Sequence, residues 1–145
     1  MIIQFLKQMA AVNICGAVRV TNAFLPLIRK HQGRVVNVAS VAGRIAIQFS
    51  GAYCITKFGV EAFSDILRLE MTRFNVGVST IEPGNFLAAT KLAGPSGITY
   101  LCRQFWEQLA ESVRKDYGGD SCVNELIDGS EQLMKLAVSH LIFHI

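Results

Sequence analysis

The sequence predicts an α/β fold built around a parallel β-sheet. Two short runs rich in β-branched residues, "RVVNVAS" (Arg34–Ser40) and "VGVSTIEPG" (Val76–Gly84), lack the alternation of half-exposed strands. Such runs are typical of parallel strands buried on both faces. The segment between them has helical periodicity, so we predict a right-handed βαβ unit in the middle of the chain. A length of 145 residues fits one domain, residues 1–145.

The first 30 residues are predicted to form a long helix, and Pro26 marks its fading end. Its apolar and small residues recur at helical spacing, at Phe5, Met9, Val12, Gly16, Val20 and Phe24. The stretch "HQG" (His31–Gly33) is then a break before the first strand.

A second helix is predicted from about Gly51 to Phe74, with Ser50 as its N-terminal cap. Its apolar stripe consists of Val60, Phe63, Leu67 and Met71. The residues expected to face water are Glu61, Asp65 and Arg68.

The C-terminal part is predicted to be mainly helical. "NFLAATKLAGPSGI", which begins at Asn85, is loop-like, and the segment 99–119 reads as one helix ending at Gly118-Gly119. The last segment is predicted to be helical, with a strand as the alternative for its apolar end, "HLIFHI".

Composition excludes several classes of protein. The chain is 51% hydrophobic and 17% charged, more apolar than an average domain. It is therefore either tightly packed or a piece of a larger protein with uncovered interior surfaces. The net charge of +3 is spread along the chain and does not indicate nucleic-acid binding.

We also expect no membrane span, no visible targeting segment and no metal site. No apolar run reaches the roughly 18 residues of a spanning helix, and the start lacks the pattern of a signal peptide. The four cysteines, Cys15, Cys54, Cys102 and Cys122, form no zinc-binding pattern and indicate reduced thiols in an intracellular compartment.

Tyr53 and Lys57 in "YCITK" are the residues most suited to proton transfer. Residues four apart share one helix face, and an ammonium near a phenol favours the phenolate and lowers a pKa that is ordinarily about 10. Ser40 ends the first strand and Gly84 the second, and the carboxyl ends of parallel strands form the usual ligand-binding edge. A short Tyr-x-x-x-Lys pattern also occurs by chance, so the residues around it must show whether the pair is catalytic.

Those neighbours resemble the catalytic segment of the short-chain dehydrogenase/reductase family. Ser40 lies thirteen residues before Tyr53, as the family's serine does, and Lys57 lies four residues after it. Asn13 in "VNICG" matches the family's active-site asparagine, and Pro83-Gly84 matches its Pro-Gly after the next strand.

The resemblance implies a role for each residue. Tyr53 would be the general acid/base, Ser40 would orient the substrate oxygen, and Lys57 would lower the tyrosine pKa and contact the nicotinamide ribose. Asn13 would hold a water of the proton relay through a local distortion of its helix. The family's contacts with the nicotinamide would fall on Pro83, Gly84 and Asn85, besides Tyr53 and Lys57.

The family's cofactor is NAD or NADP, but its T-G-x-x-x-G-x-G loop and the acidic residue that selects NAD are absent from this sequence. The resemblance therefore implies a partial Rossmann-like fold, a doubly wound parallel sheet without its N-terminal Gly-rich βαβ half. It is clear for about residues 12–118 and unclear after 122. We expect an N-terminally truncated short-chain dehydrogenase.

Within the family, the sequence is similar to the 3-hydroxybutyrate dehydrogenase branch and its retinol and hydroxysteroid dehydrogenase relatives. A 3-hydroxybutyrate-like substrate is the first expectation, and a retinoid or steroid alcohol is the second. Arg103 and Lys91 are candidate carboxylate partners, although surface charge is the simpler interpretation. By resemblance a mitochondrial or other organellar location fits.

A non-catalytic role is the alternative. In the family, the helices that match about residues 2–30 and 51–74 form subunit interfaces. The chain would then be a homo-oligomer, or it would pair with a full-length relative as a regulatory module.

Overall fold

The computed structural model describes residues 2–47, 50–84, 95–135 and 141–144. They fall into two compact units, one comprising residues 1–84 and 141–145 and the other residues 85–140. The first unit holds the sheet and the candidate site, and each unit is described separately.

The N-terminal helix is interrupted once. Helix α1 (Ile2–Asn13) and helix α2 (Cys15–Lys30) are separated by Ile14. The prediction of helix over the first 30 residues is confirmed apart from this interruption, and α2 continues past Pro26 to Lys30 without fading at the proline. A proline removes one backbone donor, while Leu25 and Ile28 of this last part pack on the core and retain the helix.

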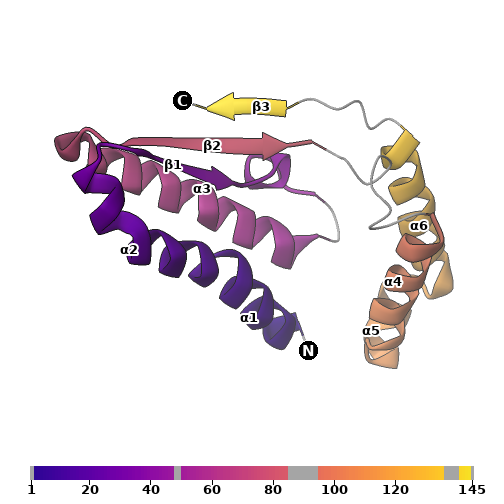
Figure 1. The fold of residues 1–145 in the computed structure, drawn as a ribbon. Coiled ribbons are helices and arrows are strands. Elements are labelled where there is room, and N and C mark those ends of the chain that lie inside the picture. Colours follow the sequence, from indigo (N-terminus) through magenta and orange to yellow (C-terminus); the bar gives the residue numbers. More distant parts are fainter. Residues whose placement is uncertain (1, 48–49, 85–94, 136–140, 145) are drawn as a thin grey trace. The chain divides into compact units, whose positions relative to one another are not determined.

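Two parallel strands frame the next helix, as predicted. β1 (Arg34–Val38) pairs in parallel with β2 (Gly77–Pro83), and α3 (Gly51–Met71) lies between them in sequence. Two short 3₁₀ turns, η1 (Val41–Gly43) and η2 (Thr72–Phe74), follow β1 and α3. In Figure 1, α1, α2 and α3 all lie on one side of these strands.

The strands were expected to be buried on both faces, and this is wrong. Val35 and Asn37 of β1 are buried, whereas Val36 and Val38 are 49% and 58% exposed. β2 likewise alternates between buried and half-buried residues. The helices of this unit cover only one face, so the hydrophobic residues of the other face remain open (Figure 1).

The core of the first unit lies between α3 and the two strands. Val60, Leu67 and Met71 of the predicted stripe are buried. Leu67 and Met71 belong to one apolar cluster, against which Phe63 packs. The remaining buried members of this cluster are Val35, Val76 and Val78.

Two details at the ends of α3 differ from expectation. The Ser50 side chain makes no capping hydrogen bond, because its backbone (φ −106°, ψ 26°) is not in the extended conformation typical of a capping residue. The α-helix ends at Met71, and its continuation to Phe74 is the turn η2.

The last strand and the second unit complete the described residues. β3 (Leu141–His144) joins the sheet antiparallel to β2, and the strand order is β1-β2-β3. The C-terminal end is therefore a strand, the alternative to the predicted helix.

The single helix predicted for 99–119 is in fact α4 (Pro95–Glu107) and α5 (Glu111–Asp116), followed by α6 (Asp120–Lys135). The second unit has its own small core of Trp106, Val123 and Ile127.

The expectation of no membrane span needs qualification. The helical stretch Ile3–Lys30 is long and apolar enough to cross a bilayer, judged by length and composition alone. A helix of a protein core or a signal sequence satisfies the same criterion, so this single stretch is weak evidence.

Candidate functional site

Ser40 lies at the carboxyl end of β1, where the sequence placed it. The ladder extends one residue beyond the strand, since Ala39 N–H donates to the Ile81 carbonyl (2.8 Å). Ser40 is extended and half-buried, and its Oγ accepts from Ala42 N–H (3.2 Å), which caps η1. This hydroxyl is therefore held by the turn that follows it.

Tyr53 and Lys57 occupy the first two turns of α3. Lys57 Nζ donates to the Val38 carbonyl at 3.2 Å and lies 5.7 Å from the centroid of the Tyr53 ring. That distance is within the range of a cation–π contact, about 6 Å. Burial lowers the pKa of Lys57, and the nearby Glu61 carboxylate opposes this shift. The ammonium thus links the end of β1 to the tyrosine.

Asn13 lies at the interruption between α1 and α2. Its Nδ2 donates to Thr56 Oγ1 (3.0 Å), and that hydroxyl donates to the Tyr53 carbonyl (2.8 Å). Thr56 is fully buried. The asparagine is therefore tied to the turn of α3 that carries the tyrosine, at the point where its own helix is distorted.

The Pro-Gly pair ends the second strand. Pro83 is the last residue of β2, and Gly84 follows it half-buried. Both therefore lie at the same edge of the sheet as the end of β1, because the two strands are parallel. Asn85 and Lys91 lie outside the described residues.

An ionic cluster with two buried carboxylates near these residues was missed from the sequence. Glu61 was expected to face water but is 4% exposed, and Glu82 of β2 is 1% exposed. Arg44 donates its Nε and Nη2 to Glu82 Oε1 (3.0 and 2.8 Å), and its Nη2 lies 3.1 Å from Glu61 Oε2. A glutamate within a buried strand was a usable signal, since such a charge requires a partner.

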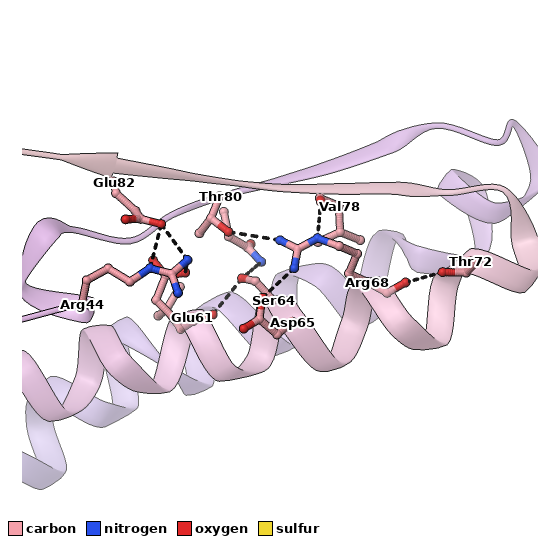
Figure 2. Close-up of polar contacts among 11 residues, drawn as sticks. Arg44, Glu61, Ser64, Asp65, Arg68, Thr72, Val78, Thr80 and Glu82 are labelled. Carbon is pink, nitrogen blue, oxygen red and sulfur yellow. Dashed lines mark hydrogen bonds and ion pairs between the residues drawn. The ribbon is translucent and has the colours of Figure 1, made fainter. Parts of the chain in front are cut away.

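Arg68 was expected to face water, but it is only partly exposed and also bonds to the sheet. Its Nε donates to the Val78 carbonyl (3.0 Å) and its Nη2 to Thr80 Oγ1 (3.4 Å), so only its contact with Asp65 is exposed, as Figure 2 shows. Long basic side chains often lie along a buried surface in this way.

In the second unit, Arg103, one of the two candidate carboxylate partners, has another polar neighbour. Arg103 is exposed and donates to Asn124 Oδ1 at 3.5 Å. Trp106 is buried in the unit's core and donates its Nε1 to Asp120 (3.1 Å), whereas Phe105 is 47% exposed.

Comparison with known proteins gives consistent results. A family model described as short chain dehydrogenase matches residues 3–97. The mitochondrial D-beta-hydroxybutyrate dehydrogenase of Rattus norvegicus is 55% identical over 112 residues, which cover 77% of this chain and 33% of that protein. Retinol dehydrogenase 16 of Mus musculus is 48% identical over 110 residues, covering 74% and 33%.

The chain thus spans about a third of the length of the curated relatives it matches. Among solved structures, the apo form of LigO from Sphingobium sp. strain SYK-6 is similar with a TM-score of 0.52. It is 25% identical, and the similarity covers 68% of this chain and 35% of that one.

Proposed function

Because the chain belongs to the short-chain dehydrogenase family, we propose that it forms the catalytic part of an oxidoreductase that interconverts a secondary alcohol and a ketone. The observation that carries this proposal is the set of contacts around Tyr53. Lys57 lies beside its ring, and Asn13 reaches its backbone through Thr56. The fold is the expected partial Rossmann-like α/β fold.

In this proposal, Tyr53 moves the hydroxyl proton. During alcohol oxidation its phenolate accepts the proton of the substrate hydroxyl, while the hydrogen on the carbinol carbon leaves as hydride. Lys57 stabilises the phenolate electrostatically, and Ser40 holds the substrate oxygen by a hydrogen bond. Asn13 holds a water that returns the proton to solvent.

The described residues fit the nicotinamide end of NAD or NADP, which accepts the hydride when bound. The fit rests on the Lys57 ammonium and on the Pro83-Gly84 backbone, both at the carboxyl ends of the parallel strands. A Gly-rich pyrophosphate loop does not occur in this sequence, so these residues are proposed to position the ribose and nicotinamide only.

For the substrate we propose a 3-hydroxy acid such as D-3-hydroxybutyrate. The support is the higher identity to the D-beta-hydroxybutyrate dehydrogenase, 55%, than to retinol dehydrogenase 16, 48%. A retinoid or steroid alcohol is the second candidate. The name of the first relative also supports a mitochondrial location.

The test uses the longest natural protein that carries this sequence. We expect oxidation of D-3-hydroxybutyrate with NAD or NADP, and a loss of at least about 100-fold in kcat for Tyr53→Phe. Tyr117→Phe is the matched control, because Tyr117 is 62% exposed in the second unit. If no secondary alcohol is oxidised, or if Tyr53→Phe keeps full activity, the proposal is wrong.

The exposed apolar side chains of the helices support a second role, as an interface with another copy or a full-length relative. They are Ile3, Val12, Val20, Phe24, Leu27, Ile55, Phe58, Ile66 and Leu69. We expect Leu69→Lys to weaken self-association measured by light scattering. A chain that is monomeric and does not co-purify with a full-length relative would contradict this role.

A further inference from the structure

Arg44, Glu61 and Glu82 form an ionic cluster in which both carboxylates are buried and the arginine side chain, 38% exposed, reaches in from the surface. One guanidinium bridges two carboxylates that are 4% and 1% exposed (Figure 2). The hydrogen bond to Glu82 raises the pKa of Arg44 and outweighs the effect of burial. Buried carboxylates are costly unless they are paired, so these three residues are held to one arrangement.

The cluster joins the three elements that carry the candidate site. Arg44 directly follows η1, which Ser40 caps. Glu61 lies one turn beyond Lys57 on α3, and Glu82 directly precedes Pro83 on β2. Each member is thus within four residues of a proposed catalytic or binding residue.

A second contact holds the same elements together. A Cβ placed on Gly43 would lie 2.9 Å from the Lys57 carbonyl oxygen, so the turn after Ser40 lies directly against the backbone of α3. The Lys57 ammonium in turn donates to the Val38 carbonyl of β1. Small rotations of α3 would therefore move Tyr53 relative to Ser40.

We propose that Arg44, Glu61 and Glu82 are positioning residues, which fix η1, α3 and the end of β2 relative to one another and thereby set the distances among Ser40, Tyr53 and Pro83. This inference rests on the proposed dehydrogenase function for its catalytic consequence. A guanidinium with several donors fixes angles as well as distances, whereas apolar packing is not directional.

The decisive variant is Arg44→Met with Glu82→Leu. Removing Arg44 alone would leave the buried Glu82 charge uncompensated, while replacing Arg44 and Glu82 together with apolar residues of similar volume is often nearly neutral for stability. Glu61 retains the nearby Lys57 ammonium in this variant. Amide hydrogen exchange of Ala42 and Gly43 then reports on the turn, because these N–H groups donate to Ser40 Oγ and Ser40 O. Gly77 N–H, bonded to the Gly33 carbonyl, serves as the reference.

We expect exchange at Ala42 and Gly43 to rise at least about 10-fold relative to Gly77 in the double variant. Arg68→Met is the matched control, since it removes an arginine from the same helix–sheet interface without touching η1. We expect this control to change the ratio less than about 2-fold. If exchange at Ala42 and Gly43 relative to Gly77 is unchanged in the double variant, the cluster only contributes to stability and the proposal is wrong.

The catalytic consequence is measured in the longest natural protein. We expect kcat of the folded double variant to fall at least about 10-fold with KM for the alcohol nearly unchanged, because misplacement affects the transition state most. Looser exchange with unchanged kcat would overturn the proposal. If the unmodified protein oxidises no alcohol, the proposed function fails, and the exchange ratios alone still decide whether the cluster positions the turn.

Discussion

The two ends of α3 contact the sheet in chemically different ways. Toward its C-terminus, Leu67 and Met71 pack against Val35 and other apolar side chains of the strands. Toward its N-terminus, where Tyr53 and Lys57 lie, the buried residues of the interface are largely polar. These polar residues are Asn37, Thr56, Glu61, Ser64, Thr80 and Glu82.

The two kinds of contact have different effects: the apolar end mainly stabilises the fold, and the polar end mainly fixes the position of the helix. Apolar burial contributes free energy roughly in proportion to area and tolerates small shifts. Buried hydrogen bonds, such as Asn37 Nδ2 to Ser64 Oγ at 2.8 Å, add little net stability but are expensive to break and fix geometry. A helix that must hold a reacting side chain at one place needs the second kind of contact there.

Shortening an apolar side chain at the C-terminal end of α3 should have the largest effect on the free energy of unfolding. We expect Leu67→Ala to lower the free energy of unfolding by about 2–5 kcal/mol, because Leu67 is 4% exposed and leaves a cavity. Leu69→Ala is the control on the same helix, at 78% exposure, and should change it by less than about 0.5 kcal/mol. Urea unfolding measures both, and equal effects would contradict the apolar packing described for this end of α3.

The apolar end was the more predictable one. Its stripe follows from the helical period, and the βαβ order follows from two β-branched runs. The family assignment from Asn13, Ser40, Tyr53 and Lys57 is confirmed by the match over residues 3–97. The roles of these residues stay predictions.

The polar end could not be predicted in the same way. Glu61 and Arg68 satisfy a water-facing pattern, yet their partners Arg44 and Val78 are distant in sequence. Periodicity gives the face of a helix but not which charged residue finds a buried partner. The burial of the strands was predicted wrongly for another reason. Their composition indicates that both faces are covered, whereas one face is open in this structure.

Two glycines allow the close contact at the polar end to be tested. In Gly43→Ala the new Cβ would meet the Lys57 backbone at 2.9 Å, and we expect a loss of about 1–3 kcal/mol on urea unfolding. In Gly59→Ala it would meet Ile14 Cδ1 at 2.6 Å, the far end of a flexible side chain, and the gain in helix propensity of about 0.5–1 kcal/mol offsets most of the cost. A larger loss of unfolding free energy for Gly59→Ala than for Gly43→Ala would contradict the close contact between η1 and α3.

The smallest expected effect is a pH dependence from Lys57. Burial lowers the pKa of this lysine from 10.5, so the unfolded chain binds the proton more tightly than the folded chain. The free energy of unfolding should therefore rise with pH between the lowered value and 10.5, and the full penalty should remain at lower pH. Tyr53 and Glu61 are the titratable neighbours on the same helix.

The measurement is the free energy of unfolding of the unmodified chain minus that of Lys57→Met, followed from about pH 7 to pH 11. The other lysines and the tyrosines are common to both chains, so this difference isolates Lys57. We expect the difference to shift in favour of the unmodified chain as pH rises. Lys115→Met, an exposed lysine of the second unit, should give a flat difference. A flat difference for Lys57 as well would mean that its ammonium is as well hydrated as one in water, and the polar end of α3 would then lack the buried, charged environment proposed around Tyr53.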